Sequence, residues 1–351
     1  MALGRLKTWS AGEVLTAADL NGEFDNIRQN ALSLISPLTA NLDVNNFQML
    51  NMRLQASTLG GLPASSSGTA GRLALLTDNI RDIVGDNGRQ WIPRSGRANV
   101  SWFATGGTGT AGDPWTGYET TINALPVGVH IDFAPRPDGI GYYQPASTIN
   151  LKSDWLITGH GPAAVIAPTS ATLNLFTGSA VSRVRVFDLS LDGPAAAAGG
   201  EETGNILHCT NCFDIMVSRL FGTEMNGGFT FKTTERVIVS AVELHNVSVY
   251  DVYILGSQKI SITGNVFHRT TASSNTPIQA TSSGGTRSNA LSVVGNYIRN
   301  TNNGIQVRDT DNVAVTGNTV LVTAPGLGHN AIGCNASANV TIADNTAEGS
   351  G

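Results

Sequence analysis

The sequence predicts a mainly β protein whose largest part is a parallel β-helix, preceded by an α-helix and a small β-meander. A motif of alternating apolar residues around an asparagine recurs along the second half of the chain. Glycine supplies 40 of the 351 residues, and only 13% of the residues are charged, about half of the usual fraction. A chain that is polar without being charged must pair neutral polar groups with one another, as stacked strands joined by glycine-rich turns do.

Residues 1–37 are predicted to form a helix that anchors or oligomerises the chain. Thr16 is a suitable N-cap, and Asp19 completes a start that resembles a capping box. Apolar residues then recur at intervals of four and three, as on one helix face: Leu20, Phe24, Ile27, Ala31 and Leu34. Pro37 ends the pattern. Because a single amphipathic helix does not fold alone, we expect the stripe to pack on the rest of the chain, on another copy or on a partner.

Residues 38–95 are predicted to be a β-rich stalk or linker. A Ser/Gly-rich stretch at residues 64–71 has the composition of a flexible link. Short apolar runs at residues 73–77, 80–84 and 89–92 are separated by Asp, Asn and Gly, which favours a meander of three strands with hairpin turns. A sheet of this size buries little core by itself, which again indicates oligomerisation.

Residues 96–351 hold internal repeats of the form apolar-x-apolar-x-Gly/Asp-Asn-x-apolar. The clearest copies begin at Ile260, Leu291, Val313 and Val340. Weaker copies begin at Trp155, Val184, Ile215 and Val237, so that successive starts lie 22 to 31 residues apart. Strands repeated at this interval do not close hairpins, but they can form the rungs of a parallel β-helix, in which each rung contacts only its neighbours.

Stacking of rungs ~4.8 Å apart places equivalent residues in columns. The first, third and eighth positions of the motif are mostly apolar, and we expect them to face inward. The sixth position is asparagine in the clearest copies: Asn265, Asn296, Asn318 and Asn345. We expect these residues to form a buried ladder in which each amide bonds to the next, a structural role without chemistry.

Composition excludes several classes of function. The net charge of −5 gives no footing for nucleic-acid binding through phosphate neutralisation. The sequence has no apolar run of ~18 residues for membrane insertion and no secretory signal. Cys209 and Cys212 have the spacing of a metal or redox pair, but no second pair accompanies them, so small buried strand residues are the expected role. We therefore expect no metal and no cofactor.

Four segments resemble the entry coil of pectate-lyase-like right-handed β-helix proteins. They are residues 109–117, 122–128, 130–135 and 156–161, which run from a Gly-rich approach through a first strand to the turn Gly159-His160-Gly161. Residues 136–141 are an insertion relative to the family's pattern. The resemblance implies that the β-helix of residues 96–351 is right-handed.

The front of the chain resembles the virion-proximal part of bacteriophage tail fibres and tail spikes. The resemblance lies in residues 9–27, beginning Trp-Ser-Ala-Gly-Glu-Val-Leu-Thr, and in residues 38–47, Leu-Thr-Ala-Asn-Leu-Asp-Val-Asn-Asn-Phe. It implies a homotrimer, assembled in the host cytoplasm and carried on the virion. It also implies that Leu20, Phe24 and Ile27 face tail, baseplate or portal proteins, and that the distal partner is a host cell-surface polysaccharide. Neither nucleic acid nor a membrane is an expected partner.

One polar column is the candidate site. Directly after the inward eighth position, successive rungs carry Asp192, Thr223, His245, His268 and Arg299. Two long insertions, residues 194–204 and 270–289, leave from this edge. Together they would frame a saccharide groove, although a rung corner that merely faces solvent is polar too.

The column supplies candidates for two roles. Phage β-helices that cleave polysaccharide use paired carboxylates, so Asp192 and Glu224 are the candidate acid/base pair, with His245 assisting. His268, Arg269 and Arg299 are candidate glycan-binding residues. The Asn-Thr-Asp, Asp-Asp and Arg-x-Lys elements of polygalacturonases are absent, as is an acidic cluster for calcium.

Several functions stay open. The leading interpretation is a structural tail fibre or spike that attaches to a host surface glycan. The second is a depolymerase, hydrolase or lyase, on the same scaffold. The third is a short adaptor fibre whose receptor binding belongs to another chain, which the absence of a recognisable cap after Ala347 favours. A free-standing bacterial β-helix is a further alternative.

Overall fold

The structure is a computed structural model. It describes residues 11–12, 14, 16–22 and 24–25, four strand backbones between residues 56 and 93, and residues 97–349 except 195–201, 274–275 and 323–329. The chain divides into two units, residues 1–54 and residues 55–351, and each is described by itself.

The N-terminal helix begins where the sequence predicts it. Residues 17–22 and 24–25 are helical. The backbone N–H of Asp19 donates to Thr16 Oγ1 at 3.2 Å, and the backbone N–H of Thr16 donates to Asp19 Oδ2 at 3.4 Å, so the predicted capping box is present. Leu20 and Phe24 are 41% and 59% exposed. Ile27 and the rest of the predicted stripe lie outside the described residues.

A small meander forms the first part of the second unit. Its strands are β1 (Ala56–Ser57), β2 (Leu73–Leu76), β3 (Asp82–Asp86) and β4 (Gln90–Pro93). The pairs β2–β3 and β3–β4 are antiparallel, as predicted, and β1 adds parallel to β2. The strand β3 runs two residues past the predicted end, because Gly85 and Asp86 pair with Trp91 and Gln90 instead of forming the turn.

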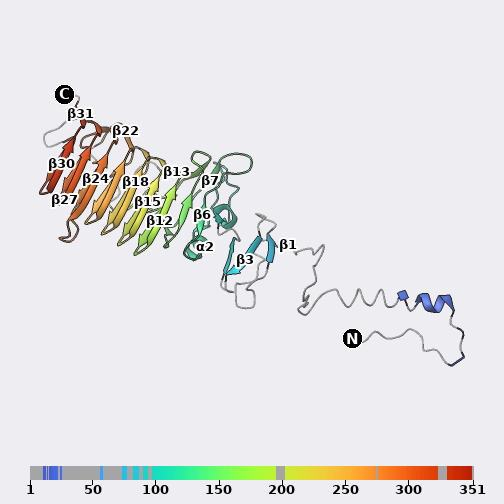
Figure 1. Ribbon diagram of the computed structural model, residues 1–351. Helices are drawn as coiled ribbons and strands as arrows, with labels where there is room; N and C mark the ends of the chain where they lie inside the picture. The colour runs from blue at the N-terminus through green and yellow to red at the C-terminus, as the bar shows by residue number, and fades with distance from the viewer. Residues whose placement is uncertain are drawn as a thin grey trace. The chain divides into compact units, whose positions relative to one another are not determined.

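Three parallel sheets follow and form the three faces of a β-helix (Figure 1). Sheet A contains β5 (Arg97–Asn99), β6 (His130–Asp132), β9 (Leu156–Thr158), β12 (Ser182–Phe187), β15 (Phe213–Ser218), β18 (Glu235–Ser240), β21 (Gln258–Thr263), β24 (Ser288–Val294), β27 (Thr310–Thr316) and β30 (Ala338–Ala343). Sheet B contains β7 (Gly141–Tyr143), β10 (Ala164–Ile166), β13 (Ser190–Asp192), β16 (Phe221–Thr223), β19 (Glu243–His245), β22 (Val266–Ser273), β25 (Tyr297–Thr301), β28 (Thr319–Val322) and β31 (Thr346–Gly349). Sheet C contains β8 (Ile149–Asn150), β11 (Phe176–Ser179), β14 (Asn205–Thr210), β17 (Gly227–Lys232), β20 (Val252–Leu255), β23 (Ile278–Thr281), β26 (Ile305–Arg308) and β29 (Ile332–Asn335). From β6 onward each strand pairs with the strand three places later, so every rung gives one strand to each sheet.

The core fills the space between the three sheets. In the rungs whose motifs begin between Val184 and Val313, positions one, three and eight are buried as the sequence predicts, for example Ile260, Ile262 and Phe267. In the last copy Ile342 is 49% exposed. The 3-10 turn Val100–Phe103 and the helix α2 (Glu119–Ala124) precede the first complete rungs, and both bury apolar side chains. Cys209 and Cys212 are also buried, as expected, whereas Cys334 in the final rung is exposed.

The predicted asparagine ladder is present at the turns from sheet A to sheet B. Asn296 Oδ1 accepts from the backbone N–H and the Nδ2 of Asn265 at 3.0 and 2.8 Å, and Asn318 Oδ1 accepts in the same way from Asn296 at 2.9 and 2.9 Å. The residue before each asparagine, glycine in three rungs and Asp344 in the last, adopts the left-handed backbone conformation that the turn requires, with φ of +65° at Gly295. The ladder thus satisfies turn backbone that lies away from water.

A second ladder, which the sequence analysis missed, lies at the turns from sheet C to sheet A. The backbone N–H of Thr234 donates to Ser257 Oγ at 3.0 Å, and that of Ser257 donates to Ser288 Oγ at 3.2 Å. These residues precede the apolar motif, so the alignment of motif copies did not cover them. Small hydroxyl side chains therefore do at this corner what asparagines do at the other.

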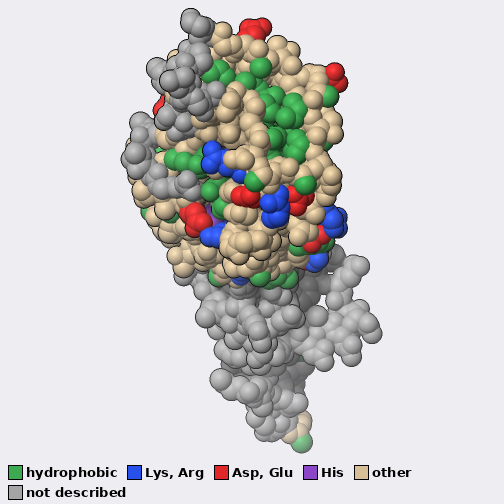
Figure 2. Space-filling model, turned by 90° about the vertical axis from the view of Figure 1, so that its left-hand side faces the viewer, with side chains coloured by type: hydrophobic (Ala, Val, Ile, Leu, Met, Phe, Trp, Pro, Cys, Tyr) green, Lys and Arg blue, Asp and Glu red, His purple; other side chains and the backbone are tan. Residues whose placement is uncertain are grey.

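Charged side chains on the outer surface are mostly paired between neighbouring rungs. Arg183 bonds Asp154, and Arg219 bonds Asp188, one rung earlier in each case. On the face seen in Figure 2, acidic and basic side chains lie beside one another on an otherwise largely uncharged surface. The low charge content and the pairing both leave few isolated charges in the described part of the chain.

Candidate functional site

The predicted polar column exists in the predicted register. Sheet B pairs Asp192 with Thr223, Thr223 with His245, His245 with His268, and His268 with Arg299, one side chain from each of β13, β16, β19, β22 and β25. Residues 194–204 leave β13 as predicted, although residues 195–201 lie outside the described residues. Residues 270–289 are not one insertion, because they include the end of β22, the strand β23 and a turn closed by Ser283 and Thr286.

The two candidate carboxylates have separate partners. Asp192 is exposed and accepts from Thr223 Oγ1 at 2.9 Å. Glu224 has a left-handed backbone, with φ of +54°, and its Oε1 accepts from Asn246 Nδ2 at 2.7 Å. Adjacent rungs thus carry both acids, but each is held by a neutral neighbour.

The centre of the column contains two histidines in contact. The rings of His245 and His268 meet edge to face with centroids 5.2 Å apart, and Phe221 lies 5.5 Å from the His245 ring. His245 Nε2 also lies 2.7 Å from Glu243 Oε1. Partial burial, and then the nearby positive groups His245, Arg299 and Arg269, lower the pKa of His268 from its ordinary value, while Glu243 acts against this shift.

The two arginines predicted to bind glycan differ in burial, since one is exposed and the other lies in the interior. Arg299 is exposed on the outer face of β25. Arg269 is only 2% exposed, and its Nη2 lies 2.6 Å from the carboxylate of the fully buried Asp251. The expectation that Arg269 binds glycan on the surface is therefore wrong. In β22 the strand alternation that turns His268 outward turns Arg269 to the opposite side.

A second outward-facing column, which contains two aromatic residues, lies beside the polar one and was not predicted from the sequence. The seventh motif position also faces outward, and its register runs from Phe221 through Glu243 and Val266 to Tyr297. Phe221 is 39% exposed and Tyr297 is 36% exposed. The signal was available in the motif, since a residue between two inward-facing neighbours must point outward. We call the outer surface formed by these two columns, from β13 to β25, the sheet B face.

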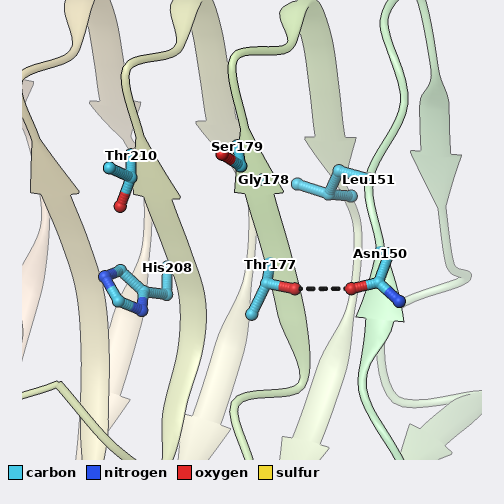
Figure 3. Close-up of a pocket in the computed structure, with 7 residues that line it drawn as sticks. All are labelled: Asn150, Leu151, Thr177, Gly178, Ser179, His208 and Thr210. Atoms are coloured by element: carbon cyan, nitrogen blue, oxygen red, sulfur yellow. Dashed lines mark hydrogen bonds between the residues drawn. The ribbon is translucent and has the colours of Figure 1, made fainter.

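A depression of about 450 Å³ lies on sheet C, apart from the column. Its lining comes from β8, β11, β14 and adjoining residues, and Figure 3 shows Asn150, Thr177 and His208 side by side on these strands. Thr177 Oγ1 donates to Asn150 Oδ1 at 3.0 Å. His208 Nε2 is buried without a hydrogen-bond partner among the described residues, and burial lowers the pKa of this histidine. The lining residues include no carboxylate, so this depression lacks the pair that glycoside hydrolysis requires.

Two further kinds of site were sought among the described residues, a metal site and a membrane-spanning helix. Within them, no group of three or more His, Cys, Asp and Glu side chains is gathered as a metal site. None of the described helices is both long and apolar enough to cross a membrane.

The three parallel sheets define the fold as a parallel β-helix. Comparison with known proteins finds the same fold. Residues 206–351 match the family model described as a right handed beta helix region. No curated protein matches the chain.

Solved structures share the fold at low sequence identity. PfbA, a surface adhesin of Streptococcus pneumoniae, is 14% identical over 72% of each chain, with a TM-score of 0.55. A family 28 exopolygalacturonase of Yersinia enterocolitica is 11% identical over 72% of this chain and 66% of its own, with a TM-score of 0.51. The enzymatically active domain of tailspike protein 2 of bacteriophage CBA120 is 13% identical over 81% of this chain and 47% of its own, with a TM-score of 0.47. The similarity to the adhesin and to the exopolygalacturonase shows the fold and no activity.

Proposed function

We propose that the chain is a structural protein of a phage tail, a fibre or spike, that attaches to the virion through its N-terminus and binds a host surface glycan with its β-helix. The observation that carries the glycan proposal is the sheet B face. Exposed rings of Phe221 and Tyr297 lie beside a column of carboxylate, hydroxyl, imidazole and guanidinium groups. Sugar rings offer C–H faces and hydroxyl groups, which aromatic and hydrogen-bonding side chains recognise together.

The proposed place on the virion rests on the N-terminal sequence. The phage-like stretch of residues 9–27 contains the capped helix, and its Leu20 and Phe24 are exposed apolar side chains available to tail, baseplate or portal proteins. Assembly then takes place in the host cytoplasm. If this holds, Phe24→Asp particles lose the protein from purified virions, whereas Val14→Asp, at a side chain that is 80% exposed, leaves incorporation unchanged. Equal incorporation of both variants contradicts the anchoring role.

The proposed assembly is a homotrimer. Leu20 and Phe24 of the N-terminal helix are exposed apolar side chains that another copy would cover, and a sheet as small as the meander needs further packing to be stable. Light scattering on the purified full chain should give about three times the monomer mass of 36.6 kDa. A mass equal to that of the monomer contradicts the trimer.

The glycan proposal is tested on an array of bacterial capsule and O-antigen polysaccharides. Tyr297→Ala should weaken binding of the recognised glycan by about tenfold, the effect of one lost aromatic contact. Ile238→Ala is the matched control, since Ile238 is an exposed apolar residue, 42% exposed, on sheet A. Absence of binding to every polysaccharide contradicts glycan attachment and favours the adaptor fibre.

The depolymerase alternative keeps Asp192 and Glu224 as its acid/base candidates, because adjacent rungs lie ~4.8 Å apart and glycosidases place their carboxyl groups about 5 to 9.5 Å apart. Incubation with the bound polysaccharide should release no new reducing ends if the chain only attaches. Release that Asp192→Asn and Glu224→Gln abolish would make the chain an enzyme, with His245 the next residue to test.

A further inference from the structure

We infer that the glycan bound by the sheet B face is acidic, and that Arg299 binds its carboxylate groups with the neighbouring His268 supplying a further N–H donor. This inference rests on the proposed glycan attachment and names the chemical class of the ligand. It gives Arg299 the role of a specificity-determining residue.

Arg299 is set apart from most arginines of the β-helix. The described residues contain ten arginines, of which eight lie within 4 Å of a carboxylate oxygen and two, Arg299 and Arg308, do not. The register explains the difference at Arg299. Its neighbours on the adjoining strands are His268 and Leu321, neither of which is an acid. An exposed guanidinium without a described carboxylate keeps its fork of donors for a planar anion.

The side chain next to Arg299 in the column is an imidazole, which can also donate an N–H to an anion. His268 lies between His245 and Arg299 in the column. Arg299 pairs with His268 in the register, so a ligand carboxylate placed here would lie beside a guanidinium and an imidazole. Glu243 is engaged by His245 at 2.7 Å, and the nearby Arg269 is engaged by Asp251 at 2.6 Å.

The acidic residues of the column lie farther away. Asp192 is three strands before His268, about 14 Å along the axis, and Glu348 is two strands after Arg299, about 10 Å. Both distances exceed the Debye length of about 8 Å at physiological ionic strength. The guanidinium of Arg299 therefore acts locally within a chain whose net charge is −5.

The exposed ring of Tyr297 gives the carboxylate of the ligand a fixed position. Tyr297 lies two residues before Arg299 on the same face of β25, so its ring and the guanidinium flank one ligand site. A sugar ring that stacks on Tyr297 would present a ring carboxylate to Arg299. A uronic acid residue meets both requirements, whereas a neutral hexose uses only the first.

The test compares acidic polysaccharides with their carboxyl-reduced counterparts on one array, using the full chain. We expect the full chain to bind acidic polysaccharides. The affinity should fall tenfold or more when the carboxyl groups are reduced, and equally in Arg299→Gln, because each change removes a charge-assisted bond to the ligand. Arg308→Gln, which removes the other arginine without a described carboxylate, is the matched control on sheet C. It should leave binding unchanged.

Three results would overturn the inference. Equal binding of acidic and reduced forms leaves glycan attachment standing but removes the acidic specificity. Equal weakening by Arg308→Gln and Arg299→Gln indicates general attraction of polyanions and removes the assignment to Arg299. Binding of no polysaccharide overturns the inference together with the proposed attachment.

Discussion

Replacing Asn296 by alanine tests whether the buried ladder holds the rungs together. Asn296 is 1% exposed, and its Oδ1 accepts from the backbone N–H of Asn265 at 3.0 Å. Its Nδ2 donates to Ile262 O at 3.0 Å and to Asn318 Oδ1 at 2.9 Å. Alanine would leave two buried N–H groups of Asn265, on the backbone and on Nδ2, without this acceptor and would weaken the satisfaction of two buried oxygens. At about 1–3 kcal/mol for a stranded buried group, the expected loss in the free energy of unfolding is about 2–4 kcal/mol.

The matched control is Asn289→Ala in the same sheet region. The Oδ1 of Asn289 accepts from Asn312 Nδ2 at 2.8 Å in an exposed pair, where water replaces a lost partner. Denaturant unfolding followed by far-ultraviolet circular dichroism should show Asn296→Ala well below wild type and Asn289→Ala within about 0.5 kcal/mol of it. If the two variants lose equal stability, the ladder does not act as a buried network and the reasoning fails.

Three further predictions concern the described core and face. Arg269→Ala should lower the free energy of unfolding by about 3–5 kcal/mol in denaturant titrations, because it strands the buried carboxylate of Asp251; a loss below 1 kcal/mol contradicts this. Because the pKa of His268 is lowered in the fold, the unfolded chain binds more protons, so stability should fall as pH drops below about 6.5 and level off below the folded pKa. His268→Gln should reduce that slope, and an unchanged slope contradicts the prediction. Gly295→Ala should cost about 1–2 kcal/mol in thermal unfolding, because φ at this residue is +65°, and no change would contradict the strain.

The register could be predicted from the sequence because three later rungs repeat the same Gly-Asn turn and the earlier rungs keep the same apolar spacing. One Gly-Asn pair fixes which neighbours face inward, and parallel pairing carries that assignment from strand to strand. The columns of Asn265 and of His268 followed in this way. Strict alternation was also enough to find Phe221 and Tyr297, but the varied residues at the seventh position hid them.

The partners of charged residues could not be predicted in the same way. Arg269 pairs with Asp251, which lies 18 residues earlier and after the end of the preceding strand of sheet B, at a position set by loop length and not by the repeat. The hydroxyl ladder of Thr234 and Ser257 was missed because it precedes the apolar motif. The distances that decide whether Asp192 and Glu224 act together likewise depend on side-chain partners, Thr223 and Asn246, which no spacing rule supplies.

Oxidative footprinting of the glycan-bound chain tests the central claim most directly. Hydroxyl radicals modify exposed aromatic, imidazole and larger aliphatic side chains, and mass spectrometry measures each one. The account predicts that the bound polysaccharide protects Phe221, His245 and Tyr297 while oxidation of Ile238 on sheet A stays unchanged. Protection of His208 at the depression on sheet C, with the sheet B face as reactive as in the free protein, would contradict it.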